Sequence, residues 1–319
     1  MKRVPIVSIA FLLLAGLAAC EKDSAPEGSG ELSSTDKDLF KFLPQGETAV
    51  FGGNYMKLQK FMTSQLGKAT AEAMEKFGPG MTKWMECFVS MRDLKLGGSA
   101  NVQGKNVQLR MAFTGMGVKD VKQCADQAGF KTNLDADGKY ISIELPPPSG
   151  TQGYLVLSNG ALYTRQSMIV SAVPVVTPGA RTELESDIAA ATKASALDDA
   201  KMQALVAKAD RTKTVWFAGT GAGTSISDKL GELWGSFDIS SGIAADISFQ
   251  LTDDTLLTKF EDGVKEMKKM SDQLPGDLKD IVESLQFSRK GDHVRLAIKI
   301  SESQLAGIVR QAGMFGGMR

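Results

Sequence analysis

The feature that most constrains this chain is a pattern of alternating apolar residues that occurs twice. Every second side chain is apolar in residues 107–113 and again in residues 243–251. A period of two predicts a strand with one buried and one exposed face. Because the segments around both strands follow in the same order, we expect a module of strands and helices that is used twice.

In the first copy, short apolar runs predict strands, and apolar residues at helical spacing predict helices. The first strand is expected to end at Gly52-Gly53. The predicted elements, in order, are a strand at 48–51, a helix at 55–66, strands leading from 94–96 to 107–113, a helix at 118–128 and a hairpin whose second arm holds Ile141, Ile143 and Leu145.

The second copy shows the same order. Its first strand is expected to end at Gly219-Thr220-Gly221, and its closing hairpin to turn at Lys290-Gly291. The predicted elements are a strand at 214–217, a helix at 226–234, strands at 237–240 and 243–251, helices at 256–274 and 278–285 separated by Pro275-Gly276, and a strand at 294–300.

The first residues of the chain indicate export. Lys2 and Arg3 precede an uncharged apolar stretch at 6–17, which leads into Leu17-Ala18-Ala19-Cys20. The stretch is shorter than the roughly 20 residues that a membrane-spanning helix needs. These residues resemble the lipobox of bacterial lipoproteins. The resemblance implies cleavage before Cys20, attachment of acyl chains such as palmitate to its thiol, and acylation of the new amine.

The residues after Cys20 predict a flexible tether. Residues 21–36 are polar, rich in Gly, Ser and Pro, and hold one aliphatic residue, Leu32. A coil of this length spans roughly 20 to 25 Å, enough to hold a folded body clear of lipid headgroups. An Asp directly after the lipidated cysteine would resemble an inner-membrane retention signal, but position 21 is Glu. We therefore expect anchoring in the outer membrane, facing the periplasm.

We therefore predict a lipid-anchored α+β protein of two related modules. Each module is expected to be a largely antiparallel, twisted sheet with helices packed on one face. The predicted divisions are a signal peptide at 1–19, a lipidated tether at 20–38, the first module at 39–180, a helical connector at 181–212, the second module at 213–312 and a flexible tail at 313–319.

The order of elements resembles uncharacterised bacterial lipoproteins in which such a module occurs in tandem behind a lipobox. The shared features are Leu43-Pro44 before the first strand, the helix-to-strand junction at 205–216 and the closing hairpin. The resemblance covers most of residues 39–312, and it implies a fold and an address but no activity.

Charge and cysteine content exclude some classes of function. Without residues 1–19 the chain loses two of its 37 basic residues and none of its 37 acidic ones, which leaves 35 against 37. This near-neutral balance argues against nucleic acid as a partner. Cys87 and Cys124 remain in an oxidising compartment, where a disulfide is expected; the alternative is two buried thiols.

One segment matches part of a calcium-loop pattern. Asn133, Asp135, Asp137 and Glu144 have the spacing of EF-hand ligands around Gly138. The pattern departs at its first position, and residues 139–145 alternate as a strand where an EF-hand needs a helix. We therefore favour a hairpin turn at Asp137-Gly138 and keep calcium as the weaker alternative.

Two further patterns suggest small ligands. Residues 219–223 (Gly-Thr-Gly-Ala-Gly) precede a predicted helix, where a phosphate could bind to free backbone N–H groups. The dinucleotide-binding motif and the P-loop motif are both incomplete here. The favoured explanation is that Ser225 or Ser227 caps the next helix. Fifteen methionines raise the possibility of Cu(I). Core packing is the expected role of pairs such as Met267 and Met270. No cofactor is expected.

A single histidine, His293, is expected on a strand facing solvent or the polar side of a sheet. One histidine cannot build a multi-histidine zinc site, although it can act as a general base.

We expect a non-catalytic binding or structural protein that contacts the membrane through Cys20 and binds an envelope protein or an apolar ligand. The alternatives are a carrier with an apolar cavity between sheet and helices, and a hydrolase with a pocket that joins His293 to distant acids.

Overall fold

The computed structural model has an α+β fold with one large antiparallel sheet, which confirms the predicted fold class. Residues 1–36, which include the predicted signal peptide, Cys20 and nearly all of the predicted tether, lie outside the described residues, as does the predicted tail. The structure describes residues 37, 39–54, 57, 59–60, 80–91, 94–144, 152–158, 160–169, 175–224, 228–239, 242–274 and 276–305.

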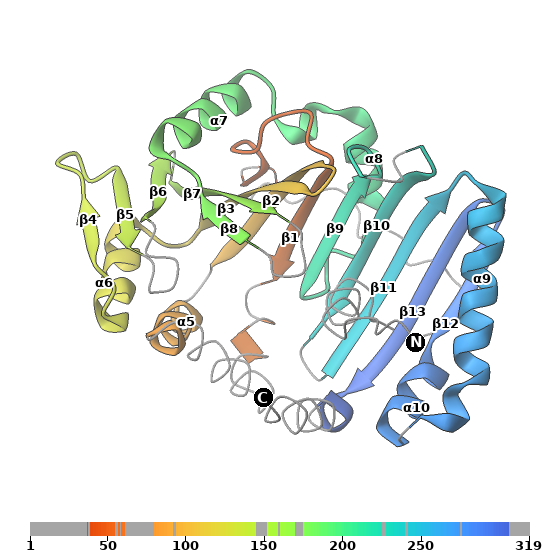
Figure 1. The fold of residues 1–319 in the computed structure, drawn as a ribbon. Coiled ribbons are helices and arrows are strands. Elements are labelled where there is room, and N and C mark those ends of the chain that lie inside the picture. Colours follow the sequence, from red (N-terminus) through yellow and green to blue (C-terminus); the bar gives the residue numbers. More distant parts are fainter. Residues whose placement is uncertain are drawn as a thin grey trace.

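Thirteen strands form the sheet, and β1 lies next to β9 at its centre (Figure 1). Twelve of them follow the order β12-β13-β11-β10-β9-β1-β2-β3-β7-β6-β5-β4, and β8 pairs with β7. The strands are β1 (Ala49–Asn54), β2 (Lys95–Gln103), β3 (Asn106–Thr114), β4 (Thr132–Leu134), β5 (Tyr140–Glu144), β6 (Gln152–Ser158), β7 (Ala161–Ile169), β8 (Val175–Pro178), β9 (Val215–Thr220), β10 (Leu230–Asp238), β11 (Gly242–Leu251), β12 (Gln286–Lys290) and β13 (His293–Ser301).

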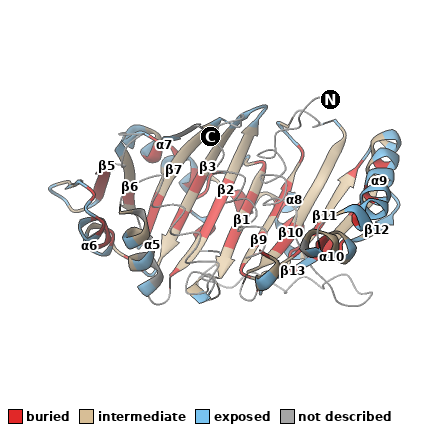
Figure 2. Ribbon diagram, turned by 60° about the horizontal axis from the view of Figure 1, so that its bottom comes forward, coloured by how far each residue is buried: buried red, intermediate tan, exposed pale blue. Residues whose placement is uncertain are grey.

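The helices pack on both sides of this sheet. We call one side the α7 face, which α7, η1 and α8 cover, and the other the α9 face, which α5 and α6 cover at one end and α9 and α10 at the other (Figures 1 and 2). No helix among the described residues is long and apolar enough to cross a membrane. The helices are α5 (Met81–Ser90), α6 (Val118–Ala128), α7 (Arg181–Lys193), η1 (Ala196–Asp198), α8 (Ala200–Lys208), α9 (Asp254–Lys269), η2 (Ser271–Gln273) and α10 (Gly276–Ser284).

The largest hydrophobic cluster lies on the α7 face. Alternation along β9 buries Trp216 and Ala218 on this face and leaves Val215 and Phe217 half-buried on the other. The Trp216 ring occupies the space beside Gly52, where a Cβ would lie 2.6 Å from it. Helix residues such as Leu184, Leu205 and Val206 complete the cluster, together with Leu39, Phe40 and Leu43.

Two separate regions of core lie at the ends of the α9 face. At one end Val121 and Ala125 of α6 pack against Ile141 of β5 and Leu162 of β7. A disulfide between Cys87 and Cys124 joins α5 to α6, with a Cα–Cα distance of 5.4 Å, and confirms the predicted pairing. At the other end α9 and α10 pack on β11, β12 and β13.

The predicted helix at 226–234 is wrong, because residues 230–238 form strand β10. The register of β10 against β11 shifts between Leu230 and Leu233. In this irregular strand the apolar residues Leu230, Leu233 and Trp234 are spaced like those on one face of a helix. Their spacing hides the period of two that a regular strand would show. The preceding strand β9 ends at Thr220, within the Gly219-Thr220-Gly221 run where its end was predicted.

The first half contains three strands that the sequence did not predict, β6, β7 and β8. As a result β7, rather than the predicted second arm β5, lies beside β3, in the place that β13 takes beside β11. The predicted helix at 55–66 lies mostly outside the described residues, of which Lys57, Gln59 and Lys60 are helical.

Candidate functional site

A cluster of buried charges lies between α7 and the sheet. Arg110 of β3 and Arg165 of β7 are direct partners on neighbouring strands, and like charges in that position repel. Asp187 of α7 lies over both guanidinium groups, and its carboxylate accepts hydrogen bonds from Arg110 Nη2 at 3.0 Å and Arg165 Nη1 at 3.2 Å. The helix therefore supplies the charge that the strand pair needs.

Two further residues complete this charge cluster, which we define as Glu47, Arg110, Tyr163, Arg165 and Asp187. Arg110 Nη1 donates to Glu47 Oε1 at 2.8 Å, and the Tyr163 hydroxyl donates to Asp187 Oδ2 at 3.0 Å. The side chains of Glu47, Arg110 and Asp187 are each exposed by 8% or less. Two arginines thus face two carboxylates in a nearly dry interface.

Burial changes the proton affinity of this cluster. It raises the pKa of Glu47 above the ordinary value of 4.5, even though the Arg110 charge acts in the opposite direction. It also raises the pKa of Tyr163, and the adjacent Asp187 charge adds to that effect. The Tyr163 hydroxyl therefore keeps its proton, and the cluster offers no exposed base or nucleophile.

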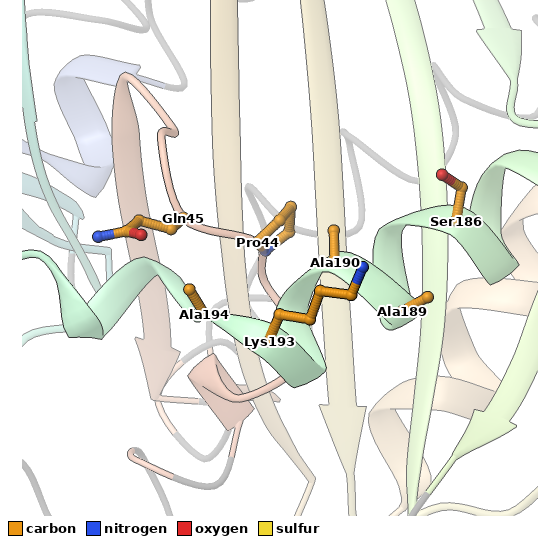
Figure 3. Close-up of a pocket in the computed structure, with 7 residues that line it drawn as sticks. All are labelled: Pro44, Gln45, Ser186, Ala189, Ala190, Lys193 and Ala194. Carbon is orange, nitrogen blue, oxygen red and sulfur yellow. The ribbon is translucent and has the colours of Figure 1, made fainter.

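A pocket of about 410 Å³ opens to solvent along α7 (Figure 3). Pro44 and Gln45 form one wall, where Gln45 N donates to Ala194 O at 3.0 Å. Its other lining residues are Ser186, Ala189, Ala190, Lys193 and Ala194. Pro44 and three alanines line most of it, and Gln45, Ser186 and Lys193 are the polar side chains that could orient a ligand.

The four calcium candidates lie on a β-hairpin. Asp135 Oδ1 accepts hydrogen bonds from the backbone N–H groups of Lys139 and Tyr140, so this carboxylate closes the turn between β4 and β5. Glu144 instead pairs with Lys131 at 3.3 Å. Asn133 lies on β4 and Asp137 in the turn, and the described residues contain no group of three metal-binding side chains.

The glycines at 219–223 serve close packing. A Cβ on Gly219 would lie 2.6 Å from the Ala49 Cβ, and one on Gly221 would lie 2.0 Å from the Leu230 carbonyl oxygen. The predicted cap residues Ser225 and Ser227 lie outside the described residues, and the described residues that follow form a turn and then strand β10 rather than the helix that was to be capped. Gly219 instead lets β9 and β1 pair at the centre of the sheet.

His293 begins β13 and contacts its sequence neighbour. Its Nδ1 lies 2.8 Å from Asp292 Oδ1, and its side chain is 41% exposed. The pocket beside α7 does not include it. Met267 and Met270 are exposed rather than packed in the core, which corrects the expectation for that pair.

A surface that the sequence analysis missed lies at the centre of the α9 face. We call it the open field and define it by Phe51, Leu96, Leu109, Met111, Val215 and Phe217. All six side chains are partly exposed, and none belongs to a hydrophobic core cluster. The described helices on this face cover only its two ends (Figure 2). The alternation of apolar residues along these strands was the available signal in the sequence. Only the strand order shows that four strands share this surface.

The strand register places these side chains in a continuous row. Phe217 is the direct partner of Phe51, Phe51 of Gly98, and Gly98 of Met111. The Phe51 ring lies against Gly98, where a Cβ would come within 2.1 Å of it. Glycine at position 98 therefore lets the Phe51 ring extend over the neighbouring strand toward Met111.

Comparisons with known proteins give little further information. No family model and no curated protein matches the chain. Crystal form III of a protein named TP0453 is similar in structure, with a TM-score of 0.45 and 11% identity over 85% of this chain and 97% of that one. Crystal form I of TP0453 has a TM-score of 0.42 and 10% identity, with coverage of 85% and 96%. This degree of likeness carries no argument about function.

Proposed function

We propose that this chain is a lipid-anchored protein of the cell envelope, facing the periplasm, with a non-catalytic binding role. The run Leu17-Ala18-Ala19-Cys20 and the polar tether after it support the anchor. The observation that carries the binding role is the partly exposed open field, because contiguous apolar patches at a protein surface mark interaction sites.

The polar groups of the described residues support a role without catalysis. Both arginines of the charge cluster are paired with carboxylates, and the Tyr163 proton is directed at Asp187. His293 contacts only the adjacent carboxylate among the acids of the described residues, which does not meet the arrangement expected of a hydrolase.

A second candidate function is carriage of a lipid or another apolar ligand. The open field favours it, since this surface offers apolar contact without charge. The interfaces between the described helices and the sheet are filled by four hydrophobic clusters, so the strands that these helices leave uncovered are the place where such a ligand would bind.

Metabolic labelling with palmitate tests the anchor. Wild-type chain should take up label and lose its first 19 residues, whereas Cys20→Ala should remain an unlabelled precursor. Ser24→Ala, in the same polar segment, is the matched control and should label as the wild type does. Equal labelling of Cys20→Ala and the control would refute the anchor.

A further inference from the structure

The chemistry of the open field restricts what can bind there. Every second residue of 49–53, 96–100, 109–113 and 215–219 points to this face, and all of them are apolar or glycine. The backbone groups of these strands are paired within the sheet ladder. A ligand on this surface therefore meets no charge and no free backbone donor, and must itself be apolar.

The open field lies outside the hydrophobic core clusters of the described residues. Its six side chains lie between two core regions, yet they belong to neither. Adjacent residues of the same strands, such as Val50, Ala112 and Trp216, are buried on the α7 face. These strands thus leave apolar side chains partly exposed on one face and bury their neighbours on the other.

The surrounding helices argue against a second copy of this chain as the occupant. α5 and α6 stand on the same face at one end of the sheet, and α9 and α10 stand on it at the other (Figure 2). A helix with its side chains is about 10 Å thick, so two such faces could not bring their sheets into contact. A flexible chain can lie between the helices directly on the strands.

We propose that acyl chains of a membrane phospholipid bind along the open field, with Phe51, Met111 and Phe217 as their main contacts. This inference rests on the proposed function, because the tether from Cys20 would hold the sheet close to a bilayer and raise the local concentration of its lipid. The bound group is the hydrocarbon, since the open field offers nothing that would recognise a headgroup.

Short-range fluorescence quenching by bromine tests this contact. The full mature chain with Cys20→Ser, which carries no lipid of its own, is mixed with phosphatidylcholine vesicles whose acyl chains are brominated or unmodified. In a Trp84→Phe background the remaining natural tryptophans, Trp216 and Trp234, lie on the α7 face. Adding Phe217→Trp places a reporter in the open field. Quenching should appear with the reporter and be nearly absent without it.

A matched pair of substitutions tests the surface itself. Met111→Gln puts an amide into the open field and should weaken vesicle binding by about tenfold. Met270→Gln makes the same change at a methionine that is 52% exposed on α9's C-terminal end and should leave binding unchanged. Urea unfolding of both variants verifies that each remains folded.

Several outcomes would overturn the inference. Equal quenching with and without Phe217→Trp would place the lipid elsewhere, and equal effects of the two glutamines would remove the open field from the interaction. A lipid-free dimer, seen by light scattering and dispersed by Met111→Gln, would identify a second copy as the occupant. Because the purified chain has no anchor, a failure here is separate from a failure of palmitate labelling in cells.

Discussion

The two faces of the sheet use the same strands but are completed in different ways. On β9 the neighbours Trp216 and Phe217 point to opposite faces; Trp216 is 4% exposed and lies in the largest core cluster, whereas Phe217 is partly exposed and lies in none. The α7 face also contains paired charges, while the six side chains that define the centre of the α9 face are all apolar. Burial by helices, rather than residue type, separates core from surface here.

The largest expected effect is a difference between two adjacent aromatic residues. Trp216→Ala should lower the free energy of unfolding by about 4 kcal/mol, because the ring fills the space beside Gly52. Phe217→Ala should lower it by only about 1 kcal/mol, because that ring is already partly in water. Urea unfolding measures both, and similar losses at the two positions would show that the α9 face is packed as tightly as the other.

The charge cluster provides a second test of the α7 face. Asp187→Ala leaves Arg110 and Arg165 facing each other without their shared carboxylate and should lower the free energy of unfolding by about 3 kcal/mol. The control is Glu185→Ala on the same helix, where a 47% exposed carboxylate pairs with Arg181 and the expected loss is under about 1 kcal/mol. Were the control to cost as much as Asp187→Ala, the burial of the Asp187 charge would not explain the loss, since alanine favours the helix at both positions.

The smallest expected effect concerns pH. Because burial raises the pKa of Glu47, its contribution to stability is present below the unfolded value of 4.5 and is lost as the pH rises through the folded value. Glu47→Gln removes this titration, so the variant should gain stability relative to the wild type as the pH rises above 4.5. Urea midpoints across that range measure the difference, and a constant difference would mean that Glu47 titrates normally.

The two halves of the chain show where sequence patterns succeed. The strand at 107–113, the helix at 118–128 and the helices of residues 254–284 follow regular spacing, and the structure contains them. β10 was predicted as a helix because its irregular register imitates helical spacing. β6, β7 and β8 follow the proline run 146–148 and were not predicted.

The candidate sites were less accessible to sequence than the elements. Cys87 and Cys124 could be paired by elimination once export was assumed, and the structure joins them. The charge cluster and the open field could not be predicted, because Arg110 meets Asp187 across 77 positions and Phe51 meets Phe217 across a strand pair between the two halves. No local pattern records such contacts.

The sequence by itself therefore determined the local features of this protein: which segments alternate between apolar and polar residues, where most helices lie, and which cysteines remain to pair. The tertiary structure alone decided that β1 and β9 join the strands into one sheet, that α7 and α8 cover the centre of the α7 face, and that the described helices cover only the ends of the other. The reason is physical. Periodicity tells which side of a strand is apolar, but the helices that cover that side come from distant parts of the chain and are set by packing.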